Sequence, residues 1–90
     1  MLKITAFIST LLLLSSNVQA GPQCTDGPNP SWIPKEKMQH QIRQQGYKIK
    51  NFKITSGGCY EIYGWNQQSQ RVEIYFHPVT GAIVKKKEED

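Results

Sequence analysis

Apolar residues recur at alternate positions in two segments, residues 59–65 and 71–77, and this period of two is typical of half-buried β-strands. One parity carries the core candidates Tyr60, Ile62, Val72, Ile74 and Phe76. The other carries Glu61, Tyr63, Trp65, Arg71, Glu73 and Tyr75. If Ile62 lies opposite Ile74, the outward pairs are Trp65 with Arg71, Tyr63 with Glu73, and Glu61 with Tyr75. All three pairs are favourable across strands, so we expect a hairpin with one apolar and one amphipathic face.

A further strand is expected before this hairpin, over residues 47–55. Its apolar residues fall on two parities, with Tyr47 and Ile49 on one and Phe52 and Ile54 on the other. One flat strand cannot bury both halves on the same face, because a shift of one residue turns each side chain over. A bulge near residue 51 would bring the two halves into phase.

The segment after the hairpin predicts a tight turn and a short fourth strand. Residues 78–81 read Pro-Val-Thr-Gly, which combines a proline that pre-sets one turn position with a glycine that accepts positive φ. This turn places Ile83 opposite Phe76, so we expect a strand over residues 82–85. The charged residues 85–90 are expected to form a solvated tail whose lysines discourage edge pairing.

Residues 31–45 predict a single helix ahead of the strands. Ser31 or its neighbour can cap it, Pro34 suits the first turn, and Gly46 stands where glycine commonly ends a helix. Its apolar stripe is narrow, as in Met38 and the isoleucine four residues later, so the helix should cover one face of a sheet. The expected fold is therefore α+β, with one N-terminal helix packed on a four-stranded antiparallel sheet.

The first twenty residues have the features of a secretory signal peptide. Lys3 supplies the positive charge, residues 4–14 are mostly apolar, and small residues lead to a cleavage site after Ala20. As a helix the apolar run would rise only roughly 16 Å, too little for a stable membrane anchor. We expect a periplasmic or secreted protein divided into a signal peptide (1–20), a Pro/Gly-rich leader (21–31) and one folded domain (32–90).

Size and cysteine content together predict a disulfide cross-link. A mature chain of about 70 residues can bury only a thin core and often carries a disulfide. Its two cysteines, Cys24 and Cys59, would lie in an oxidising compartment after export. We expect them to form a disulfide, which the chain-entropy treatment credits with about 3–4 kcal/mol. The alternatives are a zinc site, for which the spacing is unsuitable, and a reactive thiol, which needs a basic neighbour.

Charge and residue inventory argue against several classes of function. Loss of the signal peptide removes Lys3 and no acid, which leaves a formal net charge of +3 and no dense basic surface for nucleic acid. The mature aspartates, Asp26 and Asp90, are poorly placed for a catalytic triad. His40 and His77 have no metal-ligand spacing and read as surface histidines. The two outward glutamates could do acid–base chemistry but more often pair with lysine or arginine. We expect no enzymatic activity, no cofactor and no metal site.

The outward aromatic residues are the clearest functional signal. Tyr63, Trp65 and Tyr75, with Arg71 beside them, make the kind of amphipathic surface that protein interfaces favour. Two structural explanations compete with this one. Aromatic residues favour strands in any case, and the leader could fold back over them, because Cys59 shares their parity.

Several segments also resemble the PepSY domains, and more narrowly the small exported single-domain PepSY proteins of Gram-negative bacteria. The resemblance covers residues 32–85. It rests on Trp32 and on the segments Gln45-Gly46-Tyr47, Gly58-Cys59-Tyr60-Glu61-Ile62, Arg71-Val72-Glu73 and His77-Pro78-Val79-Thr80-Gly81. The family usually has Asp where this chain has His77, which leaves no carboxylate at that position.

The resemblance implies the same helix-on-sheet fold and a function in binding. It implies a non-catalytic periplasmic module that binds or restrains a peptidase or another envelope protein. The matching residues look structural, so none is carried over as a catalytic or ligand residue. The alternative is a small-ligand or metal-ion sensor or buffer in the envelope.

Overall fold

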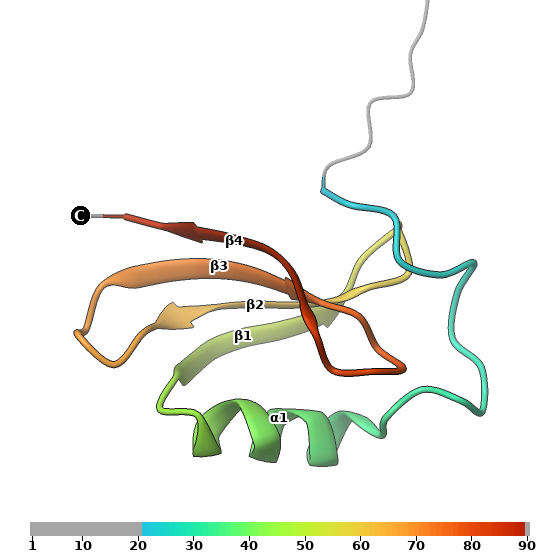
Figure 1. Ribbon diagram of the computed structural model, residues 1–90, viewed down its shortest axis with the longest axis horizontal. Helices are drawn as coiled ribbons and strands as arrows, with labels where there is room; N and C mark the ends of the chain where they lie inside the picture. The colour runs from blue at the N-terminus through green and yellow to red at the C-terminus, as the bar shows by residue number, and fades with distance from the viewer. Residues whose placement is uncertain (1–20, 90) are drawn as a thin grey trace, which may run out of the picture.

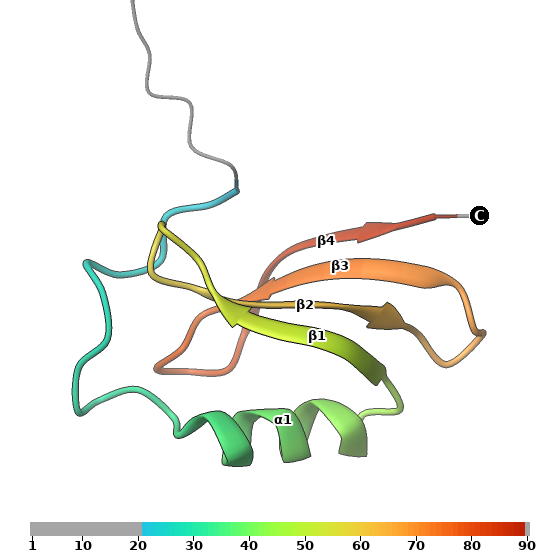
Figure 2. The ribbon, with the colours of Figure 1, turned by 180° about the vertical axis from the view of Figure 1, so that it is seen from behind.

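The computed structural model describes residues 21–89, and the expected signal peptide lies outside them. In chain order the elements are α1 (Lys35–Gln44), β1 (Lys48–Ile54), β2 (Tyr60–Trp65), β3 (Arg71–Phe76) and β4 (Ile83–Glu88). The strands form one antiparallel sheet in the order β1-β2-β3-β4, and α1 lies along one side of it (Figures 1 and 2). The predicted α+β fold, one helix packed with a four-stranded antiparallel sheet, is therefore confirmed within residues 21–89. No helix within the described range is long and apolar enough to cross a membrane.

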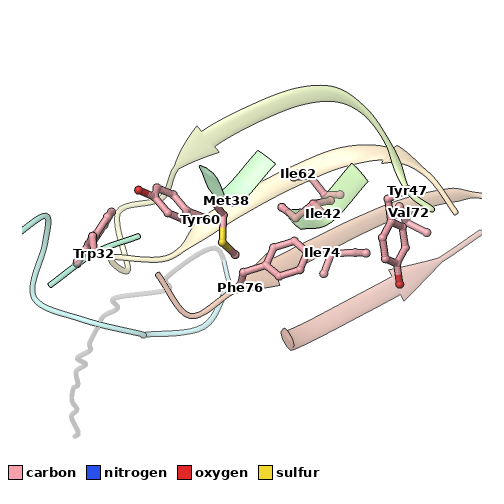
Figure 3. Close-up of a cluster of buried hydrophobic side chains, with 9 residues drawn as sticks. All are labelled: Trp32, Met38, Ile42, Tyr47, Tyr60, Ile62, Val72, Ile74 and Phe76. Carbon is pink, nitrogen blue, oxygen red and sulfur yellow. The ribbon is translucent and has the colours of Figure 1, made fainter. Parts of the chain in front are cut away.

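The core forms between α1 and the sheet. The buried cluster contains Trp32, Met38, Ile42, Tyr47, Tyr60, Ile62, Val72, Ile74 and Phe76 (Figure 3). Met38 and Ile42 are each 1% exposed, so the narrow stripe of the helix is fully used. Ile62 and Ile74 face them from the two central strands and are completely buried. Apolar side chains at a period of two on the sheet and a spacing of four on the helix therefore build one shared interior.

Strand register agrees with the prediction along the central hairpin. Ile62 lies opposite Ile74, and the neighbouring outward pairs follow as expected. In β1 the register shifts between Ile49 and Asn51, which leaves Lys50 as the extra residue of a bulge. The predicted bulge is confirmed, and with it Ile49 and Phe52 both pack against the core cluster.

The helix begins later than predicted. Residue 34, a proline, occupies the N-cap without a side-chain cap, so the expected cap at Ser31 is wrong. The residue before a proline avoids helical backbone angles, and Ile33 instead donates its N–H to the carbonyl of Pro78 at 2.7 Å. That long-range bond holds the chain in a turn before α1. The end of the helix is as predicted, with Gly46 at φ +100°.

Strand β4 continues through the segment predicted to be a solvated tail. Lys85, Lys86 and Lys87 pair with β3, although all their side chains stay exposed. An outer strand needs only its backbone to pair, so lysine side chains can extend into water without breaking the ladder. Lys87 Nζ also lies 3.9 Å from Oε1 of Glu73. The prediction of exposure was right, and the prediction that the strand ends at residue 85 was wrong.

The leader is tied to the turn between β1 and β2, and the two run side by side in both ribbon views (Figures 1 and 2). The predicted disulfide between Cys24 and Cys59 is present, with 5.2 Å between the Cα atoms. Cys24 also donates its N–H to the Gly57 carbonyl at 2.7 Å, and Thr25 Oγ1 donates to the Gly58 carbonyl at 2.9 Å. Backbone and side-chain bonds thus fix the leader beside the covalent link.

Candidate functional site on the outer face of the sheet

The outer face of the sheet, the side turned away from α1, comprises Glu61, Tyr63, Trp65, Arg71, Glu73 and Tyr75. The structure divides this face into an open part and a covered part. Tyr63 is 40% exposed, Arg71 is exposed and Trp65 is half-buried. Glu61 and Tyr75, by contrast, are only 3% and 6% exposed. The four residues predicted to bind a partner therefore do not form one open surface.

The leader covers the Tyr75 end of the face. A Cβ atom built on Gly21 would lie 2.6 Å from Cε2 of the Tyr75 ring, so the backbone of Gly21 lies directly against the ring. A Cβ atom built on Gly57, in the turn between β1 and β2, would likewise meet the carbonyl oxygen of Pro22. The competing explanation from sequence, that the leader folds back over the aromatic residues, therefore describes Tyr75 but not Tyr63.

Glu73 is the centre of a hydrogen-bond network on this face. Its Oε2 atom accepts bonds from the phenols of Tyr63 and Tyr75, both at 2.9 Å. Hydrogen bonding from Glu61 and then from these phenols lowers the pKa of Glu73, although partial burial opposes the change. Glu73 is therefore the member of the carboxyl pair that stays ionised.

Glu61 has the opposite tendency. Burial is the main cause that raises its pKa, and its neighbour Glu73 raises it further. Lys53 opposes the change, with Nζ 3.6 Å from Oε1 of Glu61, but its side chain is 57% exposed. When both carboxyls are ionised, Oε2 of Glu61 is buried with no hydrogen-bond partner among residues 21–89. A proton on Glu61 would allow it to donate to Glu73, so the two carboxyls favour sharing one proton.

Both phenols of the network hold their protons strongly. The hydrogen bond to Glu73 is the main cause that raises the pKa of Tyr63 to about 12. Burial is the main cause that raises the pKa of Tyr75, followed by its bond to Glu73. At neutral pH the two tyrosines are therefore fixed donors, which orient the Glu73 carboxylate.

A groove of about 540 Å³ opens on the uncovered part of the face. Tyr63, Trp65 and Arg71 line it, so the structure brings together three of the four predicted binding residues. Lys50 and Lys87 also line it, and the sequence analysis missed both. Lys50 reaches the groove at the bulge. Recognition that β4 continues to residue 88 would have placed Lys87 beside β3.

The histidines and Cys59, which were considered for catalysis or metal binding, do not line this groove, whereas Glu73 does. His40 is exposed on α1, and His77 accepts the N–H of Val79 through Nδ1 at 3.2 Å within a turn. Cys59 is held in the disulfide, so it offers no thiol. Over residues 21–89, no group of three or more His, Cys, Asp or Glu side chains is arranged to hold a metal ion.

Comparison with models of known families matches most of the chain. A family model described as the peptidase propeptide and YPEB domain (PepSY) matches residues 4–87. No curated protein and no solved structure matches the chain. Domains of this family are generally propeptide or binding modules without catalytic activity, and proteins that carry them are often exported. The disulfide is compatible with a location in the envelope. With nearly its whole length covered by this match, the chain belongs to the PepSY family.

Proposed function

We propose that this protein is a non-catalytic binding module of the cell envelope, which binds or restrains a peptidase or another envelope protein. In this proposal residues 1–20 direct export, residues 21–31 form the leader and residues 32–90 form the PepSY domain. The groove beside Tyr63, Trp65 and Arg71 is the single observation that carries the choice of site. Family membership supports the class of partner.

The groove has the composition of a polypeptide-binding surface. Trp65 and Tyr63 offer aromatic area for an apolar side chain, and Trp, Tyr and Arg are the residues that most often dominate binding energy at interfaces. Within residues 21–89 neither Lys50 nor Arg71 has an ion-pair partner. A partner segment with an apolar side chain beside a carboxylate would fit this combination.

Tyr75 has a different place in the proposal. It lies beneath Gly21, so a partner reaches it only if the leader moves. While the leader is docked, we therefore assign contact with the partner to Tyr63, Trp65 and Arg71. Contact between the partner and Tyr75 belongs to a state in which the leader is displaced.

The test starts from the mature protein used to capture partners from envelope extract, followed by identification and a binding measurement with the purified partner. Trp65→Ala and Arg71→Ala should each weaken that affinity about tenfold or more, as expected for residues at the centre of an interface. Lys37→Ala is the matched control, because Lys37 is an exposed cation on α1. Equal affinity of all three variants would contradict the site. If the partner is a peptidase, its activity with and without the module tests restraint directly.

A further inference from the structure

The covered part of the outer face contains a buried acceptor that lacks a donor. Glu61 is 3% exposed, and its Oε2 atom has no hydrogen-bond partner within the described residues. Lys53 contacts only the other oxygen, Oε1, at 3.6 Å. A buried ionised oxygen without a donor is costly, since it has lost its hydration and gained nothing in exchange.

The other acceptor positions nearby are already occupied. Oε2 of Glu73 takes the phenols of Tyr63 and Tyr75, and Oε1 of Glu73 lies 3.9 Å from Lys87 Nζ. The charged and titratable groups around Glu61 are therefore Glu73, Lys53 and the two tyrosines, with Lys87 on the far side of Glu73. None of them supplies a cation to Oε2 of Glu61. Without another donor the pair is satisfied by the proton shared between Glu61 and Glu73, and a positive donor bound here would take the place of that proton.

Gly21 lies against Tyr75, the residue that separates it from this part of the face. A Cβ on Gly21 would be 2.9 Å from Oη of Tyr75, and Tyr75 is the cross-strand partner of Glu61. The place of Gly21 is constrained, because the disulfide at Cys24 and the bond from Cys24 N–H to Gly57 hold the chain three residues later. The start of the leader is thus fixed beside Tyr75, which pairs with Glu61 and donates its phenol to Glu73.

We propose that Glu61, Glu73 and Tyr75 form a binding site for a primary ammonium group, and that its occupant is the α-ammonium group of Gly21 in the mature chain. The inference rests on the expected cleavage before Gly21. Inside the precursor the nitrogen of Gly21 is a neutral amide with one N–H. Cleavage turns it into a cation with several donors, which can form charge-assisted bonds to the carboxyl pair.

The identity of residue 21 agrees with this assignment. Its backbone lies against the ring of Tyr75, and any side chain would collide with the ring at the Cβ atom. Glycine therefore allows the new terminus to reach the acids that other residues would hold away. Signal-peptide removal then completes the covered part of the outer face, and the precursor lacks that charge.

The experiment uses mature protein purified after export, with its N-terminus established by intact mass. The quantity measured is the pKa of the Gly21 α-amino group, from NMR spectra of glycine-labelled protein recorded as a function of pH. We expect a pKa of about 9 or higher in place of the ordinary value of about 8. The reactive free amine at pH 7 would then be about tenfold scarcer than in an unpaired terminus. Glu61→Gln should restore the ordinary value, and Glu36→Gln on α1 is the matched control that should not.

A second variant separates loss of the Glu61 charge from any change in fold that Glu61→Gln causes. Gly21→Ala leaves both acids in place but drives a Cβ into Tyr75, so it should also restore the ordinary pKa of the terminus. An ordinary value in the unmodified protein, unchanged by either variant, overturns the proposal, and so does a mature terminus at another residue. Neither result bears on the partner site, because Trp65 and Arg71 line a groove whose walls include neither Gly21 nor Glu61.

Discussion

At the scale of single residues, Glu73 organises the outer face. It receives two phenol hydrogen bonds and lies near the lysine of β4, so its negative charge has partners on several sides. Glu61 is its cross-strand diagonal neighbour and has the less favourable environment, since it is buried with one oxygen unpartnered. Two carboxyls of the same type thus have pKa values shifted in opposite directions, chiefly by burial at Glu61 and by hydrogen bonding at Glu73.

The titration of Tyr63 tests this network. The pKa of Tyr63 is raised to about 12, chiefly because its neutral phenol donates to Glu73. Glu73→Gln should return that pKa toward the ordinary value of about 10. The stabilisation from this bond should be fully present below the unfolded pKa and be lost as the pH rises through the folded one. Phenolate absorbance as a function of pH measures the pKa of Tyr63 in the unmodified protein and in Glu73→Gln. The variant Tyr63→Phe, which lacks this transition, assigns it to Tyr63. A Tyr63 transition near pH 10 in the unmodified protein would contradict the network.

At the scale of elements, the central hairpin and the bulge were predictable from the sequence, whereas the end of β4 and the start of α1 were not. The parity of Ile62 and Ile74 determines which face is buried, whatever else the chain does, so the register and the bulge followed from the sequence. The start of α1 did not, because Ile33 bonds to Pro78, which is far along the chain. The same holds for the site. Parity placed Trp65 on the outer face, but only the docked leader buries Tyr75 there.

Docking of the leader onto the turn between β1 and β2 gives a prediction at this scale. A Cβ on Gly57 would meet the carbonyl oxygen of Pro22, which is backbone and cannot rotate away. Gly57→Ala should therefore displace the leader and lower the free energy of unfolding by about 1–3 kcal/mol, as for other overpacked sites. Urea unfolding measures the loss, and greater solvent accessibility of Tyr75 should accompany it. Ser56→Ala, at an exposed neighbour in the same turn, should change neither.

At the scale of the whole molecule, the two faces of the sheet are covered in different ways. The apolar layer between α1 and the sheet closes only one side, and the other side depends on the leader for part of its cover. The disulfide joins these parts, because Cys24 belongs to the leader and Cys59 directly precedes β2. Stability and the shape of the outer face should therefore change together when this link is lost.

Replacement of both cysteines tests that coupling. The link closes a loop with a sequence separation of 35 residues, so Cys24→Ser with Cys59→Ser should lower the free energy of unfolding by about 3–4 kcal/mol. Because Cys24 no longer anchors the leader, Tyr75 should also gain solvent exposure, and a Gly21 terminus near Glu61 should lose its raised pKa. Urea unfolding with and without reductant provides the measurement. Reductant should destabilise the unmodified protein and leave the double variant unchanged. If the double variant unfolds at the same urea concentration as the unmodified protein, the disulfide is not what holds the leader on the sheet. The hydrogen bonds of the leader are then enough to hold it there.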